Sequence, residues 1–559
     1  MIKVIQKNSV KDSRVREYVS PVKILWTSNN KKSVVENPQA LLENCDGQVT
    51  LSADNACVLR NRGEEASILL DYGVEIYGGV QIAVWECGIV PRSAKIRVRF
   101  GESAMEAMSE VGSNNTATND HAMRDQVIEV SRLGSTEIGN TGFRFVRIDL
   151  LDEGNYIELK SVRAVFLHRD LKYIGSFHSS DPVLNQVWET GAYTVHLNMQ
   201  DYLWDGIKRD RLVWIGDMHP ETSTIQAVFG NHDIVKESLD FVRDCSPLPI
   251  WMNTFPSYSI WWIIIHHDWY MQYGDLEYLR EQREYLIGLL KQLADYIDEK
   301  GNVTAPNPFL DWPSSSNKEG VLAGIHALFT LAMMNGAKLC TVLEEKETIQ
   351  QCNKAEKRLR SNIPNHANSK QAAALLALAG LMSAEEASSS VISVDGVKDF
   401  STFYGYYMLM AQAEAGDIQS GLDSIREYWG GMLRLGATTF WEDFDISWLK
   451  NAASIDELTP EGKVDVHGQY GDYCYVGYRH SFCHGWASGP TAWLSRYVLG
   501  IEILESGCRK VRISPHLGDL EWVEGTFPTP FGPISVKHMK QTDGSIATEV
   551  HVPDEIAVC

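Results

Sequence analysis

From about residue 66 to residue 170, apolar and polar side chains alternate along the chain with a period of two. In residues 96–100, for example, Ile, Val and Phe alternate with Arg. Runs of the same kind occur at residues 127–130, 143–145 and 156–159. Because such alternation places the apolar side chains on one face of a strand, this region is predicted to form an antiparallel β-sandwich.

The period changes near Asp181, which is placed to cap a helix whose first turn carries Pro182. Helical stretches then dominate to about residue 505. The predicted helices span residues 181–198, 220–243, 258–273, 275–298, 320–344, 346–361, 369–382, 384–391, 399–415, 417–434 and 487–504. Helices in tandem are buried either as an open superhelix or as a closed double ring of six hairpins. No fixed repeat period is visible, which favours the closed ring.

Short alternating strands return after Gly507 and predict a small C-terminal β-domain. The predicted domains are an N-terminal β-sandwich over residues 1–177, a helical domain over 178–505 and a C-terminal β-sandwich domain over 506–559. Four long segments rich in aromatic residues and Gly interrupt the helical region, at 200–218, 245–257, 303–318 and 436–483. They are longer than simple connections, so we expect them to carry functional residues.

The composition is typical of a soluble globular protein with an acidic surface. The chain has 51 Lys and Arg against 73 Asp and Glu, a net charge of −22, and 44% of its residues are hydrophobic. An acidic surface repels phosphate backbones and anionic lipids, so nucleic acids and membranes are poor candidate partners. A neutral small molecule or a sugar is easier to accommodate.

Residues 1–19 contain no apolar stretch of signal-peptide length. We therefore expect a cytoplasmic protein, or an exported protein whose signal was removed. The ten cysteines form no close CxxC pair and no Cys/His knuckle, so free thiols are expected and structural zinc is not. No GxGxxG, GxxxxGK[ST] or HExxH motif occurs, and no cofactor or metal is predicted.

The densest group of ionisable residues lies in the loop 205–217. It carries the carboxylates of Asp205, Asp210 and Asp217 together with two Arg, one Lys and one Trp, and a second Trp directly precedes it at residue 204. Surface ion pairs also produce such strings of charge. The aromatic setting favours a buried site instead, because burying so many ionisable groups is costly unless they pair or have a function. A buried carboxyl among Trp side chains would have its pKa raised towards that of a general acid.

A further candidate carboxylate, Glu442, lies in the segment 436–445, which also contains Phe440, Trp441 and Phe444. A solvated loop glutamate is the alternative interpretation, but an exposed loop would not need the aromatic neighbours. One carboxyl from this loop and one from the loop 205–217 would form the pair used in glycoside hydrolysis. In that pair one carboxylic acid protonates the leaving oxygen, and the other carboxylate activates water or attacks the anomeric carbon.

Other candidate residues have a structural interpretation beside the functional one. His484, before Gly485 and Trp486, is either a hydrogen-bonded core histidine or a contact for a sugar hydroxyl. The Cys483-His484 adjacency makes no catalytic thiol pair, because neighbouring side chains diverge. Three tryptophans are either core residues or platforms for the apolar faces of sugars, namely Trp261, Trp262 and Trp312. The run of residues 266–268, His-His-Asp, is interpreted as structural.

Three motifs in order resemble one known family. They are D-x(3)-R-[ED]-R-x(2)-W-x(2)-D at residues 205–217, A-T-T-x-W-E at 437–442 and H-G-W at 484–486. Together with the order of domains, over about residues 66–540, they resemble the bacterial α-L-rhamnosidases of glycoside hydrolase family 78. The resemblance implies a central (α/α)6 six-hairpin barrel, flanked by the two β-domains, that removes terminal α-L-rhamnose with inversion of configuration.

The resemblance also implies a role for each matching residue. Asp210 would be the general acid, and Glu442 the general base that deprotonates the attacking water. The rhamnose pocket would be lined by Asp205, Arg209, Trp214 and Asp217, with Trp441 and His484 beside the base. Trp262 and Trp312 match on sequence context alone. The implied partner is a carbohydrate with a terminal L-rhamnoside, and the expected assembly is a monomer or a homodimer.

Two positions depart from the family pattern. The family usually has Glu where this chain has Asp210, and its D-C-P opening is replaced by residues 205–207, Asp-Gly-Ile. Asp is one methylene shorter, and a displacement of the order of 1 Å can cost about 100-fold in rate unless the loop compensates. Two alternatives to a rhamnosidase therefore stay open. One is a glycosidase for another deoxy-sugar or a uronic acid, whose carboxylate Lys208, Arg209 and Arg211 would bind. The other is a carbohydrate-binding relative without catalysis.

Overall fold

The computed structural model describes residues 9, 11–52, 55–88, 90–112 and 116–559, and its chain divides into two compact units. Each unit is made of several separate stretches of the chain. The first unit contains Met1–Leu171, Ile207–Arg211 and Asn451–Cys483, and the second contains Lys172–Gly206, Leu212–Lys450 and His484–Cys559. The loop 205–217 is thus divided between the units, which are described separately below.

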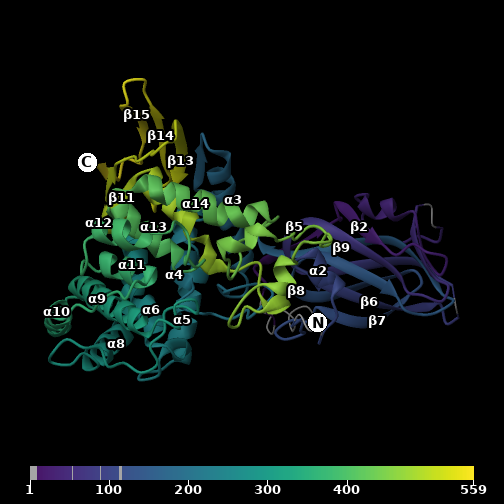
Figure 1. Ribbon diagram of the computed structural model, residues 1–559, viewed down its shortest axis with the longest axis horizontal. Helices are drawn as coiled ribbons and strands as arrows, with labels where there is room; N and C mark the ends of the chain where they lie inside the picture. The colour runs from purple at the N-terminus through teal and green to yellow at the C-terminus, as the bar shows by residue number, and fades with distance from the viewer. Residues whose placement is uncertain (1–8, 10, 53–54, 89, 113–115) are drawn as a thin grey trace. The chain divides into compact units, whose positions relative to one another are not determined.

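The first unit is built on an antiparallel sheet. Its strands are β1 (Arg14–Val19), β2 (Lys23–Thr27), β3 (Ser33–Glu36), β4 (Cys57–Asn61), β5 (Ala66–Cys87), β6 (Ser93–Gly101), β7 (Asp125–Ser131), β8 (Gly134–Leu150) and β9 (Tyr156–Arg169) (Figure 1). The predicted alternation is confirmed in β6, where Ile96, Val98 and Phe100 are buried in one large hydrophobic core. Two short helices belong to the same unit, α2 (Ala104–Met108) and α15 (Val466–Gln469).

The strands of the predicted β-sandwich are all connected by hydrogen bonds into one antiparallel network. The main order is β3-β4-β9-β5-β8-β6-β7, with β1 joined to β9 and β2 joined to β5. The reason is the length of the central strands. The first part of β5, near Asp71, pairs with β2, and its last part, residues 78–87, pairs with β9. A long strand can therefore take a different neighbour at each end.

Helices make up most of the second unit. They are α3 (Pro182–Asn198), α4 (Met218–Val228), α5 (Asp233–Cys245), α6 (Pro256–Tyr273), α7 (Leu276–Glu281), α8 (Arg283–Asp295), α9 (Lys318–Val342), α10 (Lys346–Arg360), α11 (Lys370–Leu378), α12 (Ala384–Ala387), α13 (Gly405–Glu414), α14 (Ile418–Arg434) and α16 (Gly489–Trp493). The predicted cap is confirmed, because Asp181 Oδ1 accepts hydrogen bonds from the backbone N–H groups of Val183 and Leu184 at 2.8 and 3.3 Å.

Two helix predictions were wrong at glycines. The predicted helix 220–243 is divided into α4 and α5 at Gly230, whose φ is +81°, a conformation that ends a helix readily only at Gly. The predicted helix 487–504 ends before Gly500, whose φ is +69°, and the chain continues as a strand. A Cβ at Gly500 would lie 2.2 Å from the Ser514 carbonyl oxygen, so this turn requires glycine.

The C-terminal strands form two small sheets within the second unit. Their strands are β10 (Ser176–Ser179), β11 (Ile501–Glu505), β12 (Lys510–Ile513), β13 (Trp522–Phe527), β14 (Ile534–Lys540), β15 (Ile546–His551) and β16 (Ala557–Val558). The strands β13, β14 and β15 stand at one end of the helices, coloured yellow in Figure 1. Because β10 pairs with β13 and β11 with β12, each sheet takes a strand from before the predicted boundary at 505. The domain limits stay predictions.

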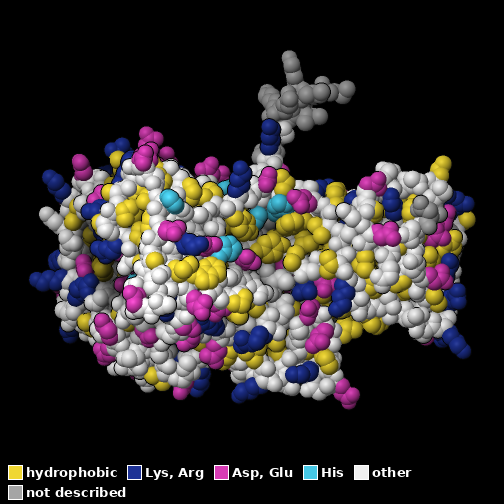
Figure 2. Space-filling view, turned by 90° about the horizontal axis from the view of Figure 1, so that it is seen from above, with side chains coloured by type: hydrophobic (Ala, Val, Ile, Leu, Met, Phe, Trp, Pro, Cys, Tyr) yellow, Lys and Arg dark blue, Asp and Glu magenta, His cyan; other side chains and the backbone are white. Residues whose placement is uncertain are grey.

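The helix α9 is long and apolar enough to cross a membrane by length and composition, but 78% of its most apolar window is buried inside the protein. It contacts α6, α10 and α11, as a core helix does. The ten cysteines all lie among the described residues and are free. On the face drawn in Figure 2, acidic and basic side chains are interspersed.

Candidate active site

Three buried ionisable side chains lie in a row in the second unit. His484 stands between two carboxylates: its Nε2 lies 3.1 Å from Asp217 Oδ2, and its Nδ1 lies 4.0 Å from Glu442 Oε1. Each of the three side chains is exposed by 7% or less. The predicted site residues Asp217, Glu442 and His484 are therefore brought together from three distant parts of the sequence.

Backbone hydrogen bonds hold His484 in this place. Its N–H donates to the Phe440 carbonyl oxygen at 2.9 Å, and it forms an antiparallel bridge with Gly206. The next N–H, of Gly485, donates to the Asp205 carbonyl oxygen at 2.8 Å. The strand-like segment 484–485 thus joins the loop that carries Asp205 to the loop that carries Glu442.

The charge on His484 follows from its neighbours. Burial alone would lower the pKa of His484, but the carboxylates of Glu442 and Asp217 outweigh burial and raise the pKa to about 9. Burial raises the pKa of Asp217, and the hydrogen bond from His484 opposes that rise. At neutral pH the row therefore holds an imidazolium between two acidic groups.

Glu442 is fixed through its own backbone. Its carbonyl oxygen accepts hydrogen bonds from Thr402 Oγ1 at 2.6 Å and from the Trp486 indole N–H at 2.9 Å. The Trp486 ring stacks on Phe403, with the ring planes 5° apart. The alternative of a solvated loop glutamate is excluded, because the Glu442 side chain is only 7% exposed.

Asp205 closes the loop that follows it. Its Oδ1 accepts a hydrogen bond from the Leu212 N–H at 2.9 Å, and its own N–H donates to the Leu212 carbonyl oxygen at 3.0 Å. Asp205 is 2% exposed. Its position supports a structural function in this loop, and the predicted contact with sugar stays a prediction.

Sequence reasoning missed Tyr258 as a site residue. Its hydroxyl donates to Asp217 Oδ1 at 3.3 Å, and the half-buried Trp214 meets its ring edge-on, with the centroids 6.0 Å apart. Tyr258 lies in the first turn of α6, directly after the long segment 245–257 that is predicted to be functional. That position was the available signal.

An aromatic row leads from Tyr258 towards the surface. Phe255 packs beside Tyr258, Phe309 stacks on Phe255, and the ring of Trp312 meets Phe309 edge-on. Trp312 is 39% exposed, so its ring is accessible for stacking against a sugar. The predicted function of Trp312 as a substrate contact stays open on this geometry.

The other predicted tryptophans are fully buried. Trp262 packs against His266 and Tyr285, and its indole N–H donates to the Leu239 carbonyl oxygen at 3.3 Å. Trp441 meets Phe444 edge-on. Their part in substrate binding stays a prediction. In the run 266–268, the ring of His267 binds the Asp268 carboxylate at 2.8 Å, in keeping with the structural interpretation.

The remaining predicted residues, Arg209 and Asp210, belong to the first unit. Asp210 Oδ1 lies 3.3 Å from Arg209 Nη1 and 3.3 Å from His121 Nε2, and the Asp210 side chain is 21% exposed. Arg209 is buried. The predicted pairing of Asp210 with Glu442 of the second unit stays a prediction.

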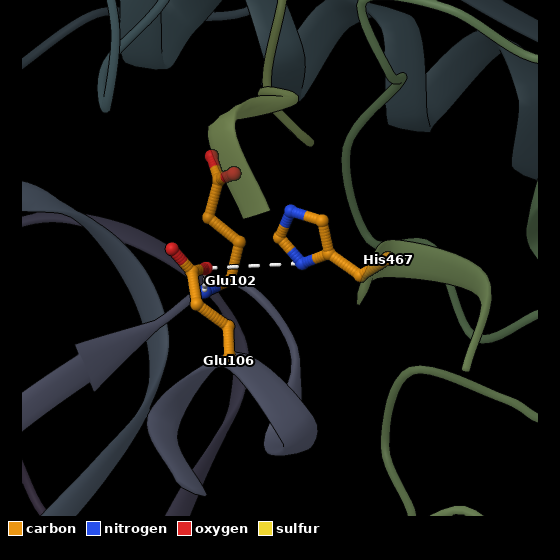
Figure 3. A group of neighbouring side chains, drawn as sticks. All are labelled: Glu102, Glu106 and His467. Atoms are coloured by element: carbon orange, nitrogen blue, oxygen red, sulfur yellow. Dashed lines mark hydrogen bonds and ion pairs between the residues drawn. The ribbon is translucent and has the colours of Figure 1, made fainter. Parts of the chain in front are cut away.

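The first unit also holds a buried group of metal-binding residue types that sequence reasoning missed. One ligand atom each of Glu102, Glu106 and His467 lies within 4.8 Å of the others, and Figure 3 shows the Glu106 carboxylate facing the His467 ring. Lys208 Nζ lies 2.8 Å from Glu102 and 3.2 Å from Glu106. An ammonium thus provides the positive charge that a metal ion would provide.

The basic residues beside Asp210 are already engaged within the first unit. Lys208 binds the two glutamates, and Arg211 donates to the backbone oxygens of Asn140, at 2.9 Å, and His121. In the hypothesis of a uronic acid substrate, Lys208, Arg209 and Arg211 bind the carboxylate of the sugar. These contacts weaken that hypothesis.

Two family models match this chain. Residues 172–393 match the bacterial alpha-L-rhamnosidase six-hairpin glycosidase domain, and residues 500–558 match the bacterial alpha-L-rhamnosidase C-terminal domain. Among curated proteins, an alpha-L-rhamnosidase from Alteromonas sp. (strain LOR) is 26% identical over 466 residues. That match covers 74% of this chain and 48% of the relative, so the chain spans about half the length of the curated protein.

Solved structures share the fold. A family 78 rhamnosidase from Bacillus sp. GL1 superposes with a TM-score of 0.73 at 21% identity, covering 93% of this chain and 55% of that one. A rhamnosidase from Klebsiella oxytoca with rhamnose bound gives a TM-score of 0.65 at 17% identity, covering 87% of this chain and 96% of that one.

Proposed function

Because the chain belongs to the bacterial α-L-rhamnosidases, whose six-hairpin and C-terminal domains it carries, we propose that it is a glycoside hydrolase acting on terminal α-L-rhamnosides. The observation that carries the proposal is the buried row of Asp217, His484 and Glu442. A carboxylate held beside an imidazolium and enclosed by aromatic side chains suits a sugar site better than a surface ion pair.

In the proposed reaction Glu442 is the general base. Its carboxylate takes a proton from a water molecule, whose oxygen attacks the anomeric carbon of rhamnose. His484 holds a positive charge beside Glu442. On its other side it contacts the Asp217 carboxylate, which also accepts a hydrogen bond from the Tyr258 hydroxyl. The charge on His484 attracts the Glu442 carboxylate, 4.0 Å away, and orients it.

Asp210 is the proposed general acid. It gives its proton to the glycosidic oxygen as the bond between that oxygen and the anomeric carbon breaks, so the leaving group departs as a neutral alcohol. We propose that the configuration is inverted, since water and the leaving group occupy opposite faces of the sugar. An inverting pair needs its carboxyl groups roughly 6.5–9.5 Å apart.

We also propose that the helices of the second unit close into an (α/α)6 barrel. Consecutive long helices in contact, such as α9 with α10 and α13 with α14, support hairpins as its building elements. A ring of hairpins would bring loops that are distant in sequence to one end, as residues 217, 442 and 484 require.

The substrate class is tested by release of free L-rhamnose from p-nitrophenyl α-L-rhamnopyranoside. We expect Glu442→Gln to abolish hydrolysis, and Asp210→Asn to retain part of it, because the activated leaving group needs little protonation. Glu427→Gln, an exposed glutamate on α14, is the matched control. Proton NMR of the first product distinguishes inversion from retention. Wild-type protein that releases rhamnose from no rhamnoside would refute the proposal, and a panel of other glycosides would then identify the sugar.

A further inference from the structure

Lys208 occupies a cage of oxygen atoms inside the first unit. The residue is 7% exposed. Its Nζ contacts Glu102 Oε2 at 2.8 Å, Glu106 Oε1 at 3.2 Å, the His480 carbonyl oxygen at 2.7 Å and the Tyr478 carbonyl oxygen at 3.0 Å. A lysine ammonium has three donors, so this cage uses its full capacity and leaves the side chain little freedom.

The two glutamates of the cage are buried and hydrogen-bonded within the first unit. Glu102 and Glu106 are completely buried, and Glu102 accepts a further hydrogen bond from the Phe482 N–H at 2.7 Å. Glu106 Oε2 accepts the Glu102 N–H at 2.8 Å. Two carboxylates in the interior are strongly unfavourable without a cation, so Lys208 cannot leave without a large cost.

Lys208 is two residues before Asp210, and the residues around it are held as well. The Gly142 N–H donates to the Ile207 carbonyl oxygen at 3.0 Å, and Arg211 Nη1 donates to the Asn140 carbonyl oxygen at 2.9 Å. Both partners lie on β8. The segment 207–211 is therefore attached on each side of Asp210 to one strand of the sheet.

We propose that Lys208 is a positioning residue: its ammonium, held by Glu102 and Glu106, fixes the backbone from which the Asp210 carboxyl projects. The inference rests on the proposed function, in which Asp210 is the general acid. An Asp carboxyl is only two side-chain torsions from the backbone, so its place follows the main chain closely. At most about 7.6 Å separates the Cα atoms of residues 208 and 210, too short a span to absorb a displacement of Lys208.

The test compares two buried lysines. Lys208→Met removes the ammonium and keeps most of the side-chain volume. Lys370→Met is the matched control, because Lys370 is 6% exposed and its Nζ also donates to two carbonyl oxygens, those of Val394 and Gly396, in the second unit. Each variant is measured for kcat and KM on p-nitrophenyl α-L-rhamnopyranoside and on a disaccharide with α-L-rhamnose linked to glucose.

A displaced proton donor slows the substrate that needs protonation. For Lys208→Met we expect kcat on the disaccharide to fall about 100-fold, which is the effect of a displacement of about 1 Å. On the nitrophenyl substrate, whose leaving group needs little acid, we expect a loss below about threefold. Lys370→Met should change kcat on both substrates by the same factor. Equal losses on both substrates in Lys208→Met would overturn the inference.

A second variant covers the case in which Lys208→Met does not fold. The double variant Lys208→Met/Glu102→Gln removes one positive and one negative charge, so the net charge of the buried group is unchanged. We expect it to fold, as judged by circular dichroism and melting temperature, and to keep the selective loss on the disaccharide. A folded double variant with the wild-type ratio of the two activities would overturn the inference.

The two proposals fail in different ways. If the wild-type protein hydrolyses neither rhamnoside, the proposed function is refuted, and the inference about Lys208 with it. If the wild-type protein hydrolyses both and the Lys208 variants lose both equally, only the positioning function is refuted.

Discussion

Replacing Glu442 by Gln should lower the pKa of His484 sharply. In the wild-type protein burial lowers this pKa, and Glu442 with Asp217 more than compensates, giving a pKa of about 9. Glu442 Oε1 lies 4.0 Å from His484 Nδ1. At an effective dielectric constant of about 20, opposite charges at about 4 Å attract by about 4 kcal/mol, equivalent to a pKa change of about 3. We expect the pKa of His484 in Glu442→Gln to be about 6.

The measurement is a titration by NMR. Protein labelled with ¹³C at histidine Cε1 is followed from about pH 5 to about pH 10, a range that includes both expected values. The signal of His484 is the one that disappears in His484→Gln. Asp443→Asn is the matched control, because it removes the adjacent carboxyl, which is not among the main charges acting on His484.

Two results would refute the reasoning. A wild-type His484 that titrates near the ordinary value of 6.5 would mean that the neighbouring carboxylates do not compensate for burial. A value that stays near 9 in Glu442→Gln would mean that Glu442 is not a main source of the shift. In either case a charged His484 could no longer be used to explain how the Glu442 carboxylate is oriented.

Further variants test the surroundings of the site. Gly485→Ala would place a Cβ 1.6 Å from the Glu221 carboxylate, and we expect a loss of about 3 kcal/mol in the free energy of unfolding, measured by denaturant titration. Trp262→Ala should cost about 3–5 kcal/mol as a core residue. Trp312→Ala should cost less stability than Trp262→Ala, because Trp312 is 39% exposed, but it should raise KM; an unchanged KM would exclude its ring from the site. Because the pKa of His484 is raised from 6.5 to about 9 in the folded protein, its charge stabilises the fold fully below about pH 6.5. As the pH rises through about 9, we expect the free energy of unfolding to fall by roughly 3 kcal/mol. The variant His484→Gln should not show this decline.

Local features of the fold could be predicted from the sequence because their causes are local. Asp181 and Pro182 identify the start of α3, and alternation identifies β6, since capping and strand periodicity depend on neighbours in sequence. The glycines at 230 and 500 were misjudged. A glycine inside a helical pattern can either continue the helix or end it. Which of the two occurs depends on its backbone conformation, which the sequence does not give.

The sequence could predict which residues belong to the site, but not which of them contact one another. Glu442 and His484 were selected for their aromatic neighbours, and the structure places them 4.0 Å apart between Nδ1 and Oε1. By contrast, Lys208 and Glu106 are separated by 102 residues. The sequence marks Lys208 only as a candidate cation for a substrate carboxylate, because a buried ion pair is recognisable only when both partners are seen together. The same holds for Tyr258, whose partner Asp217 is 41 residues away.

The discontinuous first unit has a consequence for how the protein is made. Residues 1–171 leave the ribosome before residues 207–211 and 451–483, which belong to the same unit. Synthesis of the 312 residues from 171 to 483 takes roughly 15 to 60 s at about 5–20 residues per second. Until Lys208 emerges, Glu106 has the guanidinium of Arg124 within 3.7 Å, but the ammonium that contacts both Glu102 and Glu106 is missing. The order of synthesis therefore delays completion of the first unit until most of the second has been made.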